Sequence, residues 1–305
     1  MPDVMHGDRP GMPSEDAMST AFRTLISVEE LKETRDATWV VIDARHDLAN
    51  PRAGHAGYES GHLPGAVFAH LDRDLTGTRI PGETGRRPTP DAEELAPTVR
   101  RWGVDPDTQV VVYDNHGGSM AAARLWVLLR WLGHEKVAVL DGGLLAWLAA
   151  GLPLTRAVPR SGHGAFTADL QPDWIVDTDQ VRTALNDPHT VLIDARSTEV
   201  YRGVRPSLDR VPGHIPGARC LPLQAIQTLE GTLASRRTLV MRYQALGALD
   251  TAVTTRIAYC GGGVWSAQHV LAMTHAGIND ARLYVGSWSE WIASGDRPAQ
   301  TSIAS

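Results

Sequence analysis

Residues 41–45 read VIDAR and residues 192–196 read LIDAR, so one strand-like segment occurs twice in this chain. Other segments recur in the same order, with spacings that differ by only a few residues. They are GHLPGA (61–66) with GHIPGA (213–218), VVVYD (110–114) with RIAYC (256–260), and VLDGGLLAW (139–147) with LYVGSWSEW (283–291). Several motifs repeated in one order indicate a duplicated unit, so the sequence predicts two domains of the same fold.

Short β-branched runs alternate with helical patterns inside each half of the chain. KVAVLD (136–141) is typical of a buried strand, and AAARLWVLLRWLG (121–133) is typical of a helix. Buried strands separated by helices favour a parallel sheet, so we expect two tandem, doubly wound α/β domains, each with a mainly parallel central sheet flanked by helices. The expected boundaries are a mobile tail at 1–20, a first domain at 21–157, a proline-containing linker at 158–176 and a second domain at 177–305.

Composition excludes several classes of protein. The 305 residues are 43% hydrophobic, which is enough to bury a large core. The net charge is −6 without a long run of either sign, so neither nucleic acid nor a membrane is an expected partner. Two cysteines are too few for a disulfide framework, and no signal peptide or bilayer-spanning run is recognisable, so we expect a cytoplasmic protein. The twelve histidines form no metal-binding motif, so no metal is expected.

Cys260 stands in AYCGGGVWSAQ (258–268), between a strand-like run and the start of a helix-like run. That position is the carboxyl edge of the predicted sheet, where open α/β folds place their ligands. Three glycines allow the backbone N–H groups to point inward as an anion-binding nest, which would stabilise a thiolate. The predicted active-site loop that follows the cysteine consists of Gly261, Gly262, Gly263, Val264, Trp265 and Ser266.

The loop by itself leaves three kinds of chemistry open at Cys260, namely transfer of sulfur, of a phosphoryl group or of an arsenic species. Phosphoryl transfer needs a bidentate cation on the phosphate oxygens, and Ser266 stands where a cysteine phosphatase would carry that arginine. The loop is therefore better suited to a small, singly charged group such as a persulfide held by backbone donors.

Together with the recurring motifs, this loop resembles the tandem-domain rhodaneses, the thiosulfate and 3-mercaptopyruvate sulfurtransferases, over residues 21–298. The resemblance implies two rhodanese-like domains, of which the first is inactive because Asp114 stands at the position of Cys260. It further implies that the Cys260 thiolate takes sulfur from 3-mercaptopyruvate or thiosulfate and passes it, as a persulfide, to cyanide or a thiol. No cofactor is implied, and a thioredoxin-like reductant is a candidate acceptor.

The resemblance is incomplete around the loop. A neutral loop favours 3-mercaptopyruvate as the donor, yet Gly262 and Trp265 replace the serine and threonine of mercaptopyruvate-specific members. Val200 stands where the family often carries an anion-binding arginine. The candidates for holding the donor carboxylate are arginines nearby, namely Arg205 and Arg210, with Arg202 less favoured.

Alternative interpretations remain for the function and for several residues. The departures favour a sulfur-binding or regulatory module with weak turnover of small donors, and a cysteine phosphatase or arsenate reductase is the other rival. His62 either fixes a turn common to both domains or relays a proton across the domain cleft. Trp265 covers or narrows the pocket, or packs between the domains. Cys220 and the recurring pairs Asp43–Arg45 and Asp194–Arg196 are interpreted as structural.

Overall fold

Each half of the chain forms a five-stranded, wholly parallel sheet in the computed structural model, which describes residues 21–159 and 162–302. The strand order is β1-β5-β4-β2-β3 in the first sheet and β6-β10-β9-β7-β8 in the second. The first sheet consists of β1 (Leu25–Ile26), β2 (Val40–Asp43), β3 (Val67–Phe68), β4 (Val110–Tyr113) and β5 (Val137–Leu140). The second consists of β6 (Ile175–Val176), β7 (Thr190–Asp194), β8 (Arg219–Cys220), β9 (Thr255–Tyr259) and β10 (Ala281–Tyr284). The predicted tandem doubly wound fold is confirmed.

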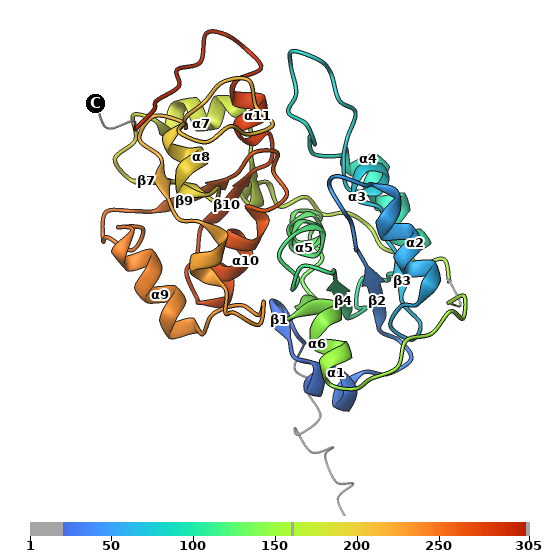
Figure 1. Ribbon diagram of the computed structural model, residues 1–305. Helices are drawn as coiled ribbons and strands as arrows, with labels where there is room; N and C mark the ends of the chain where they lie inside the picture. Colours follow the sequence, from blue (N-terminus) through green and yellow to red (C-terminus); the bar gives the residue numbers. More distant parts are fainter. Residues whose placement is uncertain (1–20, 160–161, 303–305) are drawn as a thin grey trace, which may run out of the picture.

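Helices flank both sheets (Figure 1). In the first half they are α1 (Val28–Thr34), α2 (Arg52–Ser60), α3 (Leu71–Asp74), α4 (Ala92–Arg101), α5 (Ala121–Trp131) and α6 (Gly143–Ala149). In the second half they are η2 (Pro172–Trp174), α7 (Thr178–Ala184), α8 (Thr198–Arg202), η3 (Leu223–Ile226), α9 (Arg236–Ala245), α10 (Ala267–His275) and α11 (Ser287–Trp291). Within the residues described, none of these helices has the length and apolar character needed to cross a membrane.

The duplication extends to individual hydrogen bonds. Arg45 pairs with Asp43 at 2.6 Å and donates to the Gly61 carbonyl oxygen, and Arg196 pairs with Asp194 at 2.6 Å and donates to the Gly213 carbonyl oxygen. Both aspartates are fully buried, so each pair ties the strand carrying the IDAR motif to the turn of the GH(L/I)PGA motif. The predicted ion pairing of these recurring residues is confirmed.

One of the hydrophobic clusters spans both domains, and each domain also has a cluster of its own. Helices α5 and α10 pack against each other in the middle of the molecule (Figure 1). A contiguous cluster of buried side chains runs from Trp126 of α5 to Leu271 of α10. Burial of this extent fixes the relative position of the domains, and therefore of any residues that meet between them.

Segments of each domain also reach across to the other. In the loop before α4, the Gly85 and Arg86 amides donate to the side chains of Glu290 and Ser289, in or beside α11. This is the long loop that stands beside α11 in Figure 1. In the opposite direction, the Leu233 amide donates to Asp141 at 2.8 Å. The end of each sheet is therefore covered partly by the other domain.

The stretch assigned to a linker follows the surface of the first domain. The Phe166 amide donates to the Val104 carbonyl oxygen, and the Phe166 side chain is buried. Strand β6 lies inside the predicted linker range 158–176 and adds to the edge of the second sheet beside β10. A two-residue strand next to Trp174 carries too little alternation to be recognised from sequence. The predicted tail, residues 1–20, lies outside the described residues.

Candidate active site

Cys260 directly follows β9 and precedes α10, at the carboxyl edge of the second sheet. Cys260 is only 2% exposed. The Cys260 amide donates to the Ser287 hydroxyl at 3.1 Å, and its carbonyl oxygen accepts from the Trp288 amide at 3.0 Å. These bonds use the backbone groups of the cysteine and leave its thiol for chemistry.

The loop after Cys260 is shaped by close contacts. Gly263 has a φ of +73°, and a Cβ there would lie 1.9 Å from the Val285 carbonyl oxygen. Arg86 of the first domain covers the preceding glycines: a Cβ on Gly261 would lie 2.7 Å from its Nη2 atom. Within residues 21–159 and 162–302, the backbone N–H groups of residues 261–266 have no hydrogen-bond acceptor. This run of free donors is what an anion-binding nest requires.

The corresponding loop of the first domain holds an anion of its own. The buried Asp114 carboxylate stands at the position of Cys260 and accepts four backbone hydrogen bonds. The donors are the amides of His116 at 2.8 Å, Gly118 at 2.9 Å, Met120 at 3.0 Å and Ala122 at 3.1 Å. A carboxylate is thus held where the second domain presents its thiol, so this loop geometry suits a negative charge.

Arg124, on α5, brings a buried positive charge from the first domain toward this loop. The side chain is fully buried and donates to four carbonyl oxygens, including that of Gly263 at 2.9 Å. Burial lowers the pKa of Arg124 to about 9, and a negative charge on Cys260 opposes that decrease. Arg124 therefore places a buried guanidinium against the backbone of the Cys260 loop.

A cavity of about 400 Å³ opens at the thiol. From the loop it is lined by Cys260, Gly261, Gly262, Val264 and Trp265, and from elsewhere by Arg86, Arg87, Arg196, Val200 and Asp209, among others. Each of the three arginines is already paired with a carboxylate: Arg86 with Asp209, Arg87 with Asp72 and Arg196 with Asp194. The cavity therefore offers many donors while its lining charge is largely balanced.

None of the three arginines singled out from the sequence lines this cavity. Arg205 and Arg210 line an adjacent cavity of about 280 Å³, which shares Arg196 and Val200 with the first. Arg210 also donates to the Ile292 carbonyl oxygen at 3.1 Å. Arg202 ends α8 and lines neither of these two cavities. The loop residues Gly263 and Ser266 also lie outside the lining, and the buried Ser266 hydroxyl has no hydrogen-bond partner among the described residues.

His62 is held in its own domain. Its Nδ1 lies 2.9 Å from the Tyr58 carbonyl oxygen, its Nε2 lies 3.2 Å from that of Ala157, and its ring stacks on Tyr58. His214 repeats the arrangement on Tyr201. These contacts match the turn-fixing interpretation and leave neither ring nitrogen of His62 free for a relay.

Trp265 lies at the cavity and the domain interface, whereas Cys220 lies on a strand of the second sheet. Trp265 lines the cavity and also meets His116 of the first domain edge to face, with ring centroids 5.3 Å apart, so it combines two of the roles considered for it. Cys220 lies on β8, where burial raises the pKa of its thiol to about 11, and its sulfur contacts the Arg196 carbonyl oxygen. A thiol held protonated in this way fits a structural role.

Sequence reasoning missed the contribution of the first domain, namely Arg86, Arg87 and Arg124. Arg86 and Arg87 stand in an irregular segment without a recognisable motif. Arg124 did leave a signal, because a charge in the apolar helical run AAARLWVLL must find buried acceptors.

The fold and the site together define a class: a duplicated α/β protein with a cysteine in a glycine-rich loop at the carboxyl edge of one sheet, and a second domain that lacks this cysteine. A family model described as a rhodanese-like domain matches residues 27–150 and 177–294, so the chain belongs to the rhodanese family. Relatives agree over most of the chain. A Pseudomonas aeruginosa protein, provisionally named a 3-mercaptopyruvate sulfurtransferase, is 41% identical over 86% of this chain and 92% of its own length.

Other relatives are named for one or the other of the two donors, thiosulfate or 3-mercaptopyruvate. A Mycobacterium tuberculosis protein, provisionally named the thiosulfate sulfurtransferase SseB, is 38% identical over 87% of this chain and 91% of its own. The crystal structure of Escherichia coli SseA, a 3-mercaptopyruvate sulfurtransferase, superposes with a TM-score of 0.74 at 30% identity, covering 88% of this chain and all of SseA. The protein is accordingly a sulfurtransferase.

Proposed function

We propose that Cys260 is the sulfur carrier of this sulfurtransferase and that 3-mercaptopyruvate is its preferred donor. The observation that carries the proposal is the internal comparison of the two loops. Asp114 places a carboxylate against four amides in the first domain, whereas three of the four matching amides around Cys260, those of Gly262, Val264 and Ser266, have no acceptor within the described residues. A persulfide on Cys260 would supply the missing anion.

The proposed reaction proceeds in two half-reactions through a covalent intermediate. The Cys260 thiolate attacks the sulfur of 3-mercaptopyruvate and forms an S–S bond, while the C–S bond breaks and its electron pair passes to carbon. The resulting enolate takes the proton released from the new persulfide and leaves as pyruvate. A thiol or cyanide then takes the outer sulfur, and the S–S electron pair returns to Cys260 as the thiolate.

The charges around the cavity support a singly charged donor. Arg86, Arg87 and Arg196 each neutralise a carboxylate, so the lining resembles a set of polarised donors more than a concentrated positive charge. A dianion such as thiosulfate gains more from unpaired cations, whereas a single carboxylate can be held by the remaining N–H groups. Arg86 is the best placed of the three for that contact, because it lies over Gly261 and its side chain is 25% exposed.

A sulfur-binding or regulatory module is the second candidate. Val200 and Trp265 both line the cavity and supply apolar surface there. Val200 replaces the guanidinium, and Trp265 the hydroxyl, expected of an efficient small-donor enzyme. For the phosphatase alternative, Ser266 is buried outside the lining, so the loop lacks the bidentate cation that phosphoryl transfer requires.

For the acceptor we propose a small thiol, cyanide or a thioredoxin-like reductant, acting in the cytoplasm. The reasons are the size of the cavity, about 400 Å³, and the free state of both cysteines, which suits a reducing compartment. Cell fractionation, and turnover measured with each acceptor in parallel, test these two points.

Intact-mass measurement tests the carrier and the donor together. The protein is incubated with 3-mercaptopyruvate or with thiosulfate, measured, and measured again after addition of cyanide or dithiothreitol. We expect a gain of one sulfur atom, faster with 3-mercaptopyruvate, lost with the acceptor and absent in Cys260→Ser. Cys220→Ser is the matched control and should load normally. Loading that survives in Cys260→Ser would refute the carrier, and loading of the wild type by a protein donor alone would favour the regulatory module.

A further inference from the structure

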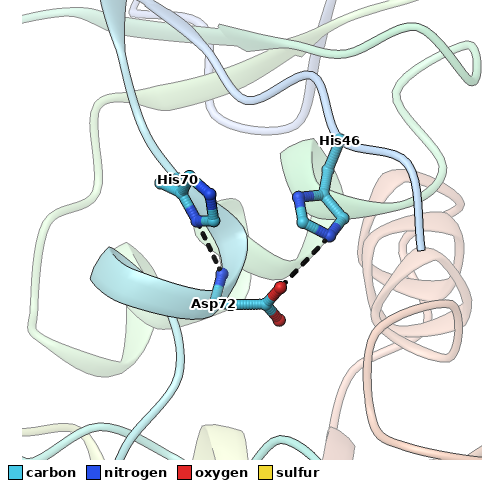
Figure 2. A group of neighbouring side chains, drawn as sticks. All are labelled: His46, His70 and Asp72. Atoms are coloured by element: carbon cyan, nitrogen blue, oxygen red, sulfur yellow. Dashed lines mark hydrogen bonds and ion pairs between the residues drawn. The ribbon is translucent and has the colours of Figure 1, made fainter. Parts of the chain in front are cut away.

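Two histidines and an aspartate meet at the carboxyl edge of the first sheet, in the domain that lacks the cysteine. His46 follows β2, and His70 and Asp72 stand at the start of α3. One ligand atom from each residue lies within 4.8 Å of the other two. Figure 2 shows the His46 ring and the Asp72 carboxylate facing each other across a short gap.

His46 is the unusual member of this group. It is 1% exposed, and neither of its ring nitrogens has a hydrogen-bond partner within the described residues. Its Nε2 faces Asp72 Oδ2 at 3.4 Å, which is longer than a normal hydrogen bond. Buried polar groups are nearly always satisfied, so a buried imidazole that meets a carboxylate only at this long ion-pair distance indicates an absent partner.

We propose that His46, His70 and Asp72 bind a divalent transition-metal ion, best represented by Zn²⁺. Two imidazoles and one carboxylate form a common ligand set for such ions. Tetrahedral ligands at zinc bond lengths lie roughly 3.3–3.5 Å apart, and His46 Nε2 and Asp72 Oδ2 are already 3.4 Å apart. The fourth position is left for water or a further ligand.

The carboxylate is oriented for this task by Arg87. Arg87 Nε donates to Asp72 Oδ1 at 2.7 Å, which leaves Oδ2 directed at His46. Hydrogen bonds of this kind to the second oxygen are typical of carboxylates that bind metals. The Asp72 side chain is 35% exposed, so an ion can reach the site from solvent.

His70 has to give up its capping hydrogen bonds for the ion to bind. Its Nδ1 caps α3 by accepting from the Asp72 amide at 3.2 Å and the Arg73 amide at 3.3 Å. A neutral imidazole has one lone pair for either purpose, so coordination exchanges these two long hydrogen bonds for a metal bond. The binding energy is reduced by that exchange, and His46 and Asp72 form the preorganised part of the site.

The duplication locates this group at the position of the active site. His46 follows Arg45 as Ser197 follows Arg196, and the paired strands have the same register in both sheets. Asp72 lies four residues after β3, as Gln224 lies four residues after β8. Ser197 and Gln224 both line the Cys260 cavity. The first domain thus has its metal ligands where the second domain has its donor pocket.

Zinc titration of the whole chain tests the site. Binding of Zn²⁺ is measured by isothermal titration calorimetry, and the zinc retained after dialysis is measured by elemental analysis. We expect one ion per chain in the wild type, and binding at least ten-fold weaker in His46→Gln and in Asp72→Asn. Asp72→Asn keeps an oxygen for Arg87, so it is expected to fold even where His46→Gln does not. His70→Asn keeps an acceptor that can cap α3, so any weaker zinc binding in this variant reports the loss of the imidazole rather than of the cap.

Two further variants separate this site from other zinc ligands. His163→Gln removes an exposed histidine outside the cluster and should bind zinc like the wild type. Cys260→Ser should also retain the ion, because the thiol is not one of the ligands. The proposal is overturned by a wild type that binds no zinc, by binding that persists in Asp72→Asn and His46→Gln, or by binding that disappears in Cys260→Ser.

Discussion

Substitution of Gly263 by alanine should disrupt the candidate active-site loop, whereas the same change at Gly262 should not. Gly263 has a φ of +73°, and its added Cβ would meet the Val285 carbonyl oxygen at 1.9 Å. The left-handed conformation costs an alanine about 1–2 kcal/mol, and forcing two backbone segments apart costs about 1–3 kcal/mol more. We expect a loss of about 2–5 kcal/mol in the free energy of unfolding.

Gly262→Ala is the matched control, one residue away in the same loop. Its Cβ would contact Arg86 Nε at 3.3 Å, and a flexible side chain can withdraw by a few tenths of an ångström. Urea denaturation measures the stability of both variants, and intact mass after incubation with 3-mercaptopyruvate measures sulfur loading. Gly263→Ala should lose both stability and loading, because displaced amides no longer converge on the sulfur.

The result that would refute this reasoning is a Gly263→Ala variant within about 1 kcal/mol of the wild type that loads sulfur at the normal rate. Such an outcome would mean that the loop adapts and that its backbone donors are not what stabilises the persulfide. Equal damage in both variants would instead mean that the position of Arg86, rather than backbone conformation, controls the loop.

Three further predictions concern charged or buried groups. Arg124→Met should lower the unfolding free energy by about 3 kcal/mol or more, since four carbonyl oxygens, three of them in buried contacts, lose their donor. Arg124→Lys should recover part of this free energy, and unchanged urea midpoints would contradict the prediction. Arg86→Met should raise KM for 3-mercaptopyruvate about ten-fold or more, because it leaves the buried Asp209 carboxylate unpaired against an anion; adding Asp209→Asn should lower KM again. Burial lowers the pKa of His269 to about 4 from 6.5, so its contribution to stability is complete above pH 6.5 and is lost as the pH falls toward 4. Unfolding measured at about pH 5 and pH 7.5 should show a loss of about 2 kcal/mol that disappears in His269→Gln.

The fold and the position of the candidate reactive residue were accessible from the sequence. Strand and helix periodicities are local properties, and their repetition in two halves predicts the duplication without any long-range information. Cys260 was recognisable because the three glycines that follow it, residues 261–263, indicate a tight turn rich in backbone donors. The ion pairing of Asp43 with Arg45 and of Asp194 with Arg196 was predictable for the same reason, since the members of each pair are two residues apart in the chain.

The surroundings of the thiol depended on contacts between distant segments. Arg86 reaches the Gly261–Gly262 backbone and Arg124 reaches the Gly263 carbonyl oxygen only because α5 and α10 pack together and the first domain extends a loop over the second. Conversely, Arg202, Arg205 and Arg210 follow the right strand in sequence but lie outside the lining of the Cys260 cavity. Nearness in sequence to an active-site strand does not determine the direction in which a loop turns.

The sequence by itself therefore determined the two-domain α/β fold, the duplication and the position of the thiol, because these follow from residue periodicity and local backbone conformation. Only the tertiary structure decided that Asp114 fills its own nest, which arginines surround the cavity, and that His46 meets His70 and Asp72. The physical reason is that a parallel sheet collects the carboxyl ends of strands far apart in the chain at one edge. Which side chains meet there depends on the strand order and on the packing of one domain against the other.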